Sequence, residues 1–143
     1  MRSMKVLLSI KPEFAERILN GTKRFEFRRS VFTNRSVQTV VLYVTQPVSK
    51  IVGEFDIAQI ITEQPDGLWR RTSDYAGISR EFFDAYFAGR ESAHAIEVGT
   101  VRKFDEPIDP NLAIDNFTPP QSYMYVSDQI GRVLGDDRQF SLI

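Results

Sequence analysis

Residues 21–29, GTKRFEFRR, bring cations and a carboxylate within a few positions of one another. Lys23 offers a point charge whose pKa falls when the side chain is buried. Arg28 offers a planar fork that can bind a carboxylate or a phosphate through two hydrogen bonds. Glu26, held by these cations, can accept a hydrogen bond from a base amine or act in proton transfer. The three side chains could bind an anionic or hydrogen-bonding ligand, and Lys23 and Glu26 are the candidate catalytic residues if the protein is an enzyme.

The spacing of this segment leaves two interpretations open. Residues 23–28 alternate as a strand does, which places the two phenylalanines on one face and Arg24, Glu26 and Arg28 on the other. A solvated strand face with cross-strand ion pairs is the interpretation that spacing alone favours. The alternative is a ligand site, in which a Lys directly after a helix end converges with a Glu and an Arg.

Three other residues extend the candidate site. Lys11 stands where an apolar strand meets a helix, and helix N-termini attract anions. Tyr43 and Thr45 alternate on an apolar strand, and such residues can stack on a base and donate a hydrogen bond to it. Each also has a structural interpretation, as a flanking surface lysine or as buried strand residues. The predicted ligand-binding set is Lys11, Lys23, Glu26, Arg28, Tyr43 and Thr45.

The composition argues against several other kinds of site. The chain has no cysteine, which excludes disulfides and thiol catalysis, and one histidine, so we predict no metal site and no cofactor. We interpret His94 as a packed or cross-strand residue. The sequence contains no phosphate-binding Walker loop, dinucleotide fingerprint, nucleophile elbow or HExxH motif. The aromatic stripe Phe82, Phe83, Tyr86 and Phe87 follows helical spacing, and we expect it in the core rather than as a stacking platform.

Positive charge is concentrated near the N-terminus. Residues 1–35 hold nine Lys/Arg and three Glu, a net charge of +6, whereas residues 36–143 hold nine Lys/Arg and sixteen Asp/Glu, a net charge of −7. Such asymmetry indicates a local anion-binding surface on a chain that otherwise repels polyanions. A protein that coats DNA without sequence preference is usually basic throughout, so the overall charge argues against that role.

The elements that must position these residues follow from hydrophobic periodicity and turn signals. A helix begins at Pro12 and ends at Asn20-Gly21, and Pro65-Asp66-Gly67 is expected to be a turn. The segment 119–134 could form a terminal helix, or its PPQSY start could close over a pocket. Other helices are expected near residues 68–75 and 80–89, and strands at 4–10, 23–28, 39–45, 50–62 and 92–104.

Strands separated by helices, without a repeated βαβ period, predict an α+β fold. The expected architecture is a small, twisted, partly closed β-barrel decorated with helices, in a single domain over residues 1–143. No apolar run approaches the roughly 20 residues of a membrane span, and the N-terminus does not have the pattern of a signal peptide. We therefore predict a cytoplasmic protein that does not enter membranes. Its oligomeric state does not follow from the sequence.

The segments SIKPEFAERILNGTKRFEFRR and VVLYVTQPVSKIVGEFDI resemble the ASCH domain family of the PUA-like superfamily, whose hallmark is G-x-K-x-x-[polar]-x-R. Here the hallmark positions are Gly21, Lys23, Glu26 and Arg28. The segments GISREFFDAYFAGRESAHAIEVG and PPQSY resemble the prokaryotic and phage subgroup. The resemblance extends from about residue 4 to about residue 126 and implies a compact β-barrel with helices and a cleft beside the barrel mouth.

The resemblance also implies a function. The family binds RNA or nucleotide-like ligands; some small members are amidohydrolases acting on N4-acetylcytidine, and others are linked to ribonuclease activity. In the amidohydrolases the motif supplies a catalytic Lys and Thr, assisted by a later acid. Lys23 and Arg28 match the motif, but Glu26 stands where the Thr would be, which removes the hydroxyl nucleophile. Asp74 and Glu81 are the candidates for the later acid.

Three functions are therefore open. The first expectation is binding of RNA, or of a modified nucleoside or nucleotide, in a local basic cleft. The alternative is a metal-independent hydrolase acting on acylated nucleosides or on RNA phosphodiesters, with Lys23 stabilising charge and Glu26 as general base. The third is a partner domain whose charges are merely solvated. Convergence of the charged side chains on a concave pocket would separate the first two from the third.

Overall fold

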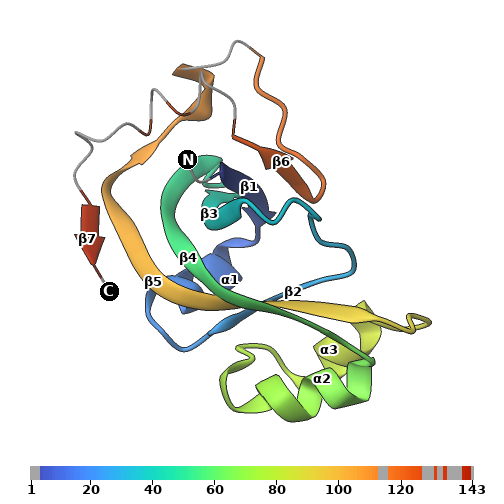
Figure 1. Cartoon of the computed structure of the whole chain (residues 1–143). Coiled ribbons are helices and arrows are strands. Elements are labelled where there is room, and N and C mark those ends of the chain that lie inside the picture. Colours follow the sequence, from blue (N-terminus) through green and yellow to red (C-terminus); the bar gives the residue numbers. More distant parts are fainter. Residues whose placement is uncertain (1–3, 113–115, 127–130, 132–133, 135–139, 143) are drawn as a thin grey trace.

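The computed structural model describes residues 4–112, 116–126, 131, 134 and 140–142, which are organised around one mixed sheet. Strands β1 and β3 pair in parallel, and the other described pairs are antiparallel. In Figure 1 the long, curved β4 and β5 wrap around β1 and β3, so the sheet forms a curled, partly closed barrel. The strands in sheet order are β2 (Phe25–Arg28), β5 (Ala93–Ile108), β4 (Lys50–Glu63), β3 (Val37–Val44), β1 (Met4–Ile10) and β6 (Tyr123–Tyr125), and β7 (Phe140–Leu142) also pairs with β5.

The α-helices α1, α2 and α3 accompany this sheet, as expected for an α+β fold. Helix α1 (Pro12–Leu19) follows β1 directly, begins at a proline and ends before Gly21, which has the left-handed φ of 87° that glycine accepts without strain. Helices α2 (Pro65–Thr72) and α3 (Arg80–Tyr86) lie beside the far ends of β4 and β5 (Figure 1). The described helices include none that is long and apolar enough to cross a membrane.

The buried apolar side chains of the described residues form three clusters. Strands β1 and β3 are covered on both faces, so they contribute to two of these clusters. Successive residues of β1 point to opposite faces, and Val6, Leu7 and Leu8 are all buried. A barrel cluster inside the curl contains Val6, Leu8, Val40, Leu42, Phe55 and Ile96, among others. An outer cluster contains Leu7, Val41, Tyr43, Ile51, Phe104, Ile108 and Leu134. A cap cluster between the sheet and the two later helices contains Phe27, Ile61, Leu68, Phe83, Phe87 and Ala95, among others.

Most predicted elements are found within a few residues of their predicted bounds. The strand at 4–10 and the helix from Pro12 are confirmed, and β5 extends four residues beyond its predicted end at 104. Gly53 lies where a Cβ atom would come within 2.5 Å of the Arg102 carbonyl oxygen, so its lack of a side chain lets the backbones of β4 and β5 approach closely.

Two local predictions are wrong. Pro65, in the expected turn, instead begins α2, where its missing N–H costs nothing. A terminal helix was one of two alternatives for residues 119–134, and it is wrong for Tyr123–Tyr125, which form β6 and pair with β1 through Leu8 and Tyr123. Tyr123 also packs on the Phe32 ring, whereas Gly131 and Leu134 are helical. Residues 127–130 and 132–133 of that expected helix lie outside the described residues.

Candidate functional site

Lys23, Glu26 and Arg28 reach one place because the chain folds back along α1 before β2 begins. After Gly21, the Lys23 amide donates to the Arg17 carbonyl at 3.0 Å. The Arg24 amide then donates to the Tyr75 carbonyl at 2.9 Å, and the Arg24 carbonyl accepts from the Val98 amide at 2.8 Å. These bonds fix the start of β2 against β5, so the side chains that follow have defined directions.

The result is a cleft of about 180 Å³ between the start of α1, the strand β2 and the helix α3. Four of the six predicted binding residues line it, namely Lys11, Lys23, Glu26 and Arg28. The charged side chains therefore converge on a concave pocket, which is the arrangement that separates a site from a solvated face. The remaining lining residues are Ser9, Ile10, Phe14, Phe27, Ile78, Phe82 and Tyr86.

Lys23 is almost completely buried, with 1% of its surface exposed. Its Nζ donates to the Ala76 carbonyl at 2.7 Å and lies 4.7 Å from the centre of the Phe27 ring and 5.5 Å from that of Phe14. Burial lowers the pKa of Lys23 to about 8, the charge of Glu26 opposes this shift, and nearby arginines add to it. A larger fraction of Lys23 is therefore deprotonated near neutral pH than of an ordinary lysine.

Glu26 and Arg28 form a buried ion pair on the barrel side of β2. Arg28 Nη2 lies 2.9 Å from Glu26 Oε2, and the two side chains are 11% and 7% exposed. Glu26 also lines the cleft, so its carboxylate can accept a hydrogen bond from a ligand there. The prediction of a solvated polar face is thus wrong for these two residues, while Arg24 on the same stretch is exposed.

Arg28 also connects the cleft to the segment before β6. Its Nη2 donates to the Ser9 carbonyl at 2.9 Å, and its Nη1 donates to the Ser122 carbonyl at 3.4 Å. The Ser9 hydroxyl donates to the Pro120 carbonyl at 2.7 Å, so the PPQSY segment is tied to this side of the cleft. Arg28 Nε is buried and has no hydrogen-bond partner among the described residues, which leaves one donor for a ligand or a water molecule.

Tyr43 and Thr45 lie apart from this cleft, on a neighbouring hollow that they share with Asn111, Phe117 and Pro119. Tyr43 is buried and its ring packs on Phe117, with 5.3 Å between centroids. The structure therefore does not bring these two residues together with the Lys23 cluster. The segment 117–120 lies between the two hollows. Phe117 and Pro119 line the second hollow, and Pro120 is bonded to Ser9 of the cleft.

The other candidates for chemistry lie outside the cleft lining. Asp74 and Glu81, the candidates for a later acid, are both exposed. His94 pairs across the sheet with Thr62, whose Oγ1 is 2.8 Å from His94 Nδ1, in agreement with its interpretation as a cross-strand residue. Within the described ranges, no group of three or more His, Asp or Glu side chains is arranged to hold a metal ion.

Sequence reasoning missed the wall of the cleft formed by α3 and the turn before it. Phe83 and Phe87 are core residues as predicted, but Phe82 is 38% exposed and lines the cleft with Tyr86. Gly77 has a φ of 68°, and a Cβ atom there would lie 2.5 Å from Lys23 Cβ. Helical spacing could have separated these faces, since residues 82 and 86 share one face of the helix and 83 and 87 another.

The cleft combines three chemical capacities. A carboxylate oxygen can accept from an N–H or O–H group, and the adjacent guanidinium and ammonium groups can donate to a carbonyl or an anion. The aromatic walls can contact a flat ring, and Lys11 adds a cation at the exposed edge, with its Nζ 5.7 Å from the centre of the Phe82 ring. A nucleotide, with a planar base, polar edges and a phosphate, has all the complementary groups.

Three comparisons with known proteins identify the family and the fold. The model of the ASCH domain matches residues 8–107. A Zymomonas mobilis protein described as an ASCH domain-containing ribonuclease is 30% identical over 129 residues, which cover 85% of this chain and 84% of that protein. The crystal structure of ASCH from Zymomonas mobilis superimposes with a TM-score of 0.87 at 27% identity, over 96% of this chain and 98% of that one.

A second relative is much longer than this chain. A large ribosomal subunit protein of Ureaplasma parvum is 31% identical over 123 residues, which cover 85% of this chain. The matched region is 39% of that ribosomal protein, so the chain spans about two fifths of its length.

Proposed function

The chain belongs to the ASCH domain family, and from that premise we propose that it binds single-stranded RNA by taking one unstacked nucleotide into the cleft. The observation that carries the proposal is the convergence of Lys23, Glu26 and Arg28 in a cleft with aromatic walls. A relative that this chain matches over most of both lengths is described as a ribonuclease, which supports RNA as the ligand.

The distribution of charge and the size of the cleft favour a single strand over a duplex. Sequence-specific RNA recognition uses unpaired bases that stack on aromatic side chains and present their polar edges. A cleft of about 180 Å³ has room for one base. The chain outside this region carries excess negative charge, which would repel a long duplex.

Each predicted residue has a role in this proposal. The Glu26 carboxylate accepts from a base N–H, and Arg28 and Lys23 donate to a carbonyl or ring nitrogen on the same edge. Lys11, exposed at the rim, faces the phosphate. Tyr43 and Thr45 extend the binding surface on the other side of the segment 117–120, where the strand can continue.

A binding titration tests the proposal. We expect wild-type protein to bind short 2′-O-methyl oligoribonucleotides, which cannot be cleaved through their 2′ oxygen, and Glu26→Gln to weaken this binding about tenfold because one strong acceptor is replaced. Glu97→Gln is the matched control, since Glu97 lies on the neighbouring strand β5 outside the cleft lining. Equal affinity of wild type and Glu26→Gln would remove this site from the proposal.

A second candidate function, cleavage of the RNA phosphodiester, is favoured by the lowered pKa of Lys23. In this reaction Glu26 takes the proton of the ribose 2′-OH while the 2′ oxygen attacks phosphorus. Arg28 and Lys23 stabilise the charge on the phosphorane, and protonated Lys23, with its pKa of about 8, gives a proton to the departing 5′ oxygen. The products are a 2′,3′-cyclic phosphate and a 5′-hydroxyl, and solvent returns both residues to their starting protonation states.

Product analysis distinguishes cleavage from binding alone. We expect unmodified RNA to yield cyclic-phosphate ends in the presence of a chelator, with the rate falling at least about a hundredfold in Glu26→Gln. The rate should also fall as the pH rises above 8, because Lys23 then loses the proton that it donates. If the RNA stays intact after long incubation, cleavage is excluded and only the binding function remains. Turnover of acylated nucleosides instead of RNA would point to amide hydrolysis at the same residues.

A further inference from the structure

We infer that Phe82 and Tyr86, on the exposed face of α3, form a stacking platform for a second nucleotide, so that the ligand is a single-stranded RNA segment rather than a free nucleoside. The inference rests on the proposed function and extends it from one nucleotide in the cleft to a run of at least two.

The two rings are arranged as a platform. Phe82 and Tyr86 lie one helical turn apart, their planes are inclined by 15°, and their centroids are 6.3 Å apart. Phe83 on the same short helix and Phe87 at its C-cap are 0% and 2% exposed and account for its packing on the sheet. Phe82, at 38% exposure, is therefore not needed to fill the core, and both rings border the cleft.

Cations accompany both rings, which favours a nucleotide over an apolar peptide or a lipid. Lys11 Nζ lies 5.7 Å from the centre of the Phe82 ring, and the Arg29 guanidinium lies 4.3 Å from that of Tyr86. Arg29 Nε also donates to the Tyr86 carbonyl at 2.7 Å, which fixes its position. Aromatic rings with adjacent cations are the usual means of holding a base and its phosphate in single strands.

The acidic residues of α3 do not cancel this charge. Asp84 is paired with Arg80 at 2.9 Å. Glu81, the other acidic residue of the helix, is exposed and lies outside the cleft lining.

The size of the cleft gives an independent reason for a second contact outside it. Pockets that enclose a drug-sized ligand usually have about 300–1,000 Å³, whereas this cleft has about 180 Å³. The next nucleotide of a strand must therefore lie beyond the opening, where Phe82 is exposed and Tyr86 is half-buried.

The experiment compares affinity as a function of ligand length. Mixed-sequence 2′-O-methyl oligoribonucleotides of one, two and four residues are titrated by calorimetry against wild type, Phe82→Ala, Phe82→Trp and Tyr75→Ala. Tyr75 is the matched control because it is 54% exposed and lies outside the cleft lining. Thermal melting of each variant confirms that it is folded.

We expect affinity to rise with length in wild type, and Phe82→Ala to reduce that gain about 5- to 140-fold, the range for loss of one stacked base. Phe82→Trp should keep the gain, and Tyr75→Ala should bind like wild type. An equal gain in Phe82→Ala, or an equal loss in Tyr75→Ala, would overturn the platform.

The two proposals fail differently. If a single nucleotide binds and Glu26→Gln weakens it, but affinity does not rise with length, the cleft keeps its proposed function and the platform is wrong. If no length of RNA binds to wild type, both are wrong, and capture of a peptide or of a second copy of the chain at these rings would take their place.

Discussion

Arg28 joins three parts of the chain at the scale of one residue. It pairs with Glu26 of its own strand and donates to the carbonyls of Ser9 at the end of β1 and Ser122 before β6. A guanidinium can serve these acceptors at once because its donors form a fixed planar fork. The residue therefore positions the carboxylate of the cleft and holds the segment before β6 beside it.

Arg28→Lys should lower the free energy of unfolding by about 1–3 kcal/mol, because lysine keeps the buried charge but cannot reach all three acceptors. Urea unfolding followed by circular dichroism measures the change. Arg24→Lys, at an exposed position on the same stretch, should change the free energy by no more than about 0.5 kcal/mol. Equal effects of the two substitutions would contradict the bridging role.

Lys23 should make stability depend on pH in an unusual direction. Its pKa is about 8 in the folded chain and has the ordinary value of 10.5 in the unfolded chain, so between these values the unfolded chain binds the extra proton. The stability contributed at this position therefore rises with pH from 8 to 10.5. Wild type should gain free energy of unfolding relative to Lys23→Met over that range. A difference that stays constant with pH would show that the pKa is not lowered.

The charged residues of the cleft were predictable from the sequence, but their burial and the aromatic wall were not. Alternation in β2, the position after a helix end and the resemblance to the ASCH motif together singled out Lys23, Glu26 and Arg28. Burial depends on β5, α3 and the segment before β6, which lie far away in sequence, so no local pattern carries it. The same limit applies to Tyr43, because its strand is evident but the hollow that it faces is set by Phe117.

The turn before α3 is the element that sets the depth of Lys23. Ala76 supplies the carbonyl for its Nζ, and Gly77 leaves room for its stem. The turn can adopt this shape because Gly77 tolerates a positive φ of 68°.

Gly77→Ala should destabilise the protein more than Gly89→Ala. Both positions have left-handed φ values, of 68° and 77°, so both substitutions carry similar backbone strain. Only at Gly77 would the new Cβ meet Lys23, whereas nothing lies within 4 Å at Gly89. The difference in unfolding free energy, about 1–3 kcal/mol by urea titration, isolates the contact. Equal losses would mean that Lys23 moves aside freely.

The segment 119–125 should be held in place by Ser9. Ser9→Ala removes the hydrogen bond to the Pro120 carbonyl, so the amides of β6 should exchange with deuterium faster, by a factor corresponding to about 0.5–2 kcal/mol. Ser92→Ala, at an exposed position, serves as the control. If the exchange rates in β6 do not change, pairing with β1 alone holds this strand in place, and the Ser9 hydrogen bond does not contribute.

Element prediction failed where long-range pairing overrides local preference. The stretch before Ser127 was compatible with a helix, yet Tyr123–Tyr125 pairs with β1. As a strand, its successive side chains reach the barrel cluster and the outer cluster in turn. The apolar strands and the helix from Pro12 were predictable because their patterns are long and bounded by Pro, Asn or Gly.

At the scale of the whole molecule, the positive charge of the first 35 residues is concentrated around the cleft. Lys11, Lys23, Arg28 and Arg29, all from the basic first 35 residues, surround the cleft and its rim. The alternation of strands and helices was enough to predict an α+β barrel, while the curl of the sheet depends on the length and curvature of β4 and β5 (Figure 1).

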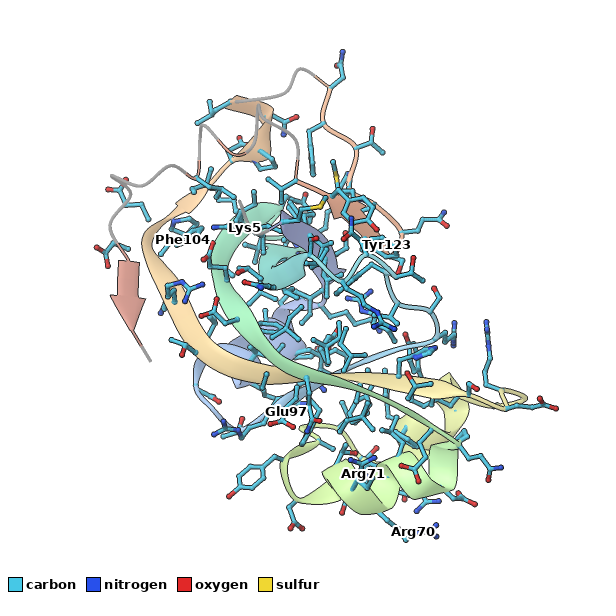
Figure 2. The ribbon with its side chains drawn as sticks, viewed as in Figure 1. Lys5, Arg70, Arg71, Glu97, Phe104 and Tyr123 are labelled. Atoms are coloured by element: carbon cyan, nitrogen blue, oxygen red, sulfur yellow. The ribbon has the colours of Figure 1, made fainter. Side chains whose placement is uncertain are left out.

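Binding of a tetranucleotide should weaken with salt, with a slope that reflects only a few phosphate contacts. Arg29→Gln should reduce the slope of log affinity against log salt by about 0.7, the value for one contact in a single strand. Arg70→Gln should leave it unchanged, since Arg70 lies on α2 on the side away from the sheet (Figure 2). Equal slopes for all three proteins would exclude Arg29 from the interface.

The cap formed by α2 and α3 has a consequence for how the protein loses its function. These helices have eight and seven residues, too short to persist without packing on β4 and β5. Helix α3 and the turn before it supply Ile78, Phe82 and Tyr86 to the cleft, and the Ala76 carbonyl holds Lys23. The barrel strands, α1 and the residues next to α1 supply the rest. Fraying of the cap alone would dismantle the ligand site while the barrel stays folded. Inactivation by urea should therefore precede melting of the sheet, and a ligand should protect the cap before it protects the barrel.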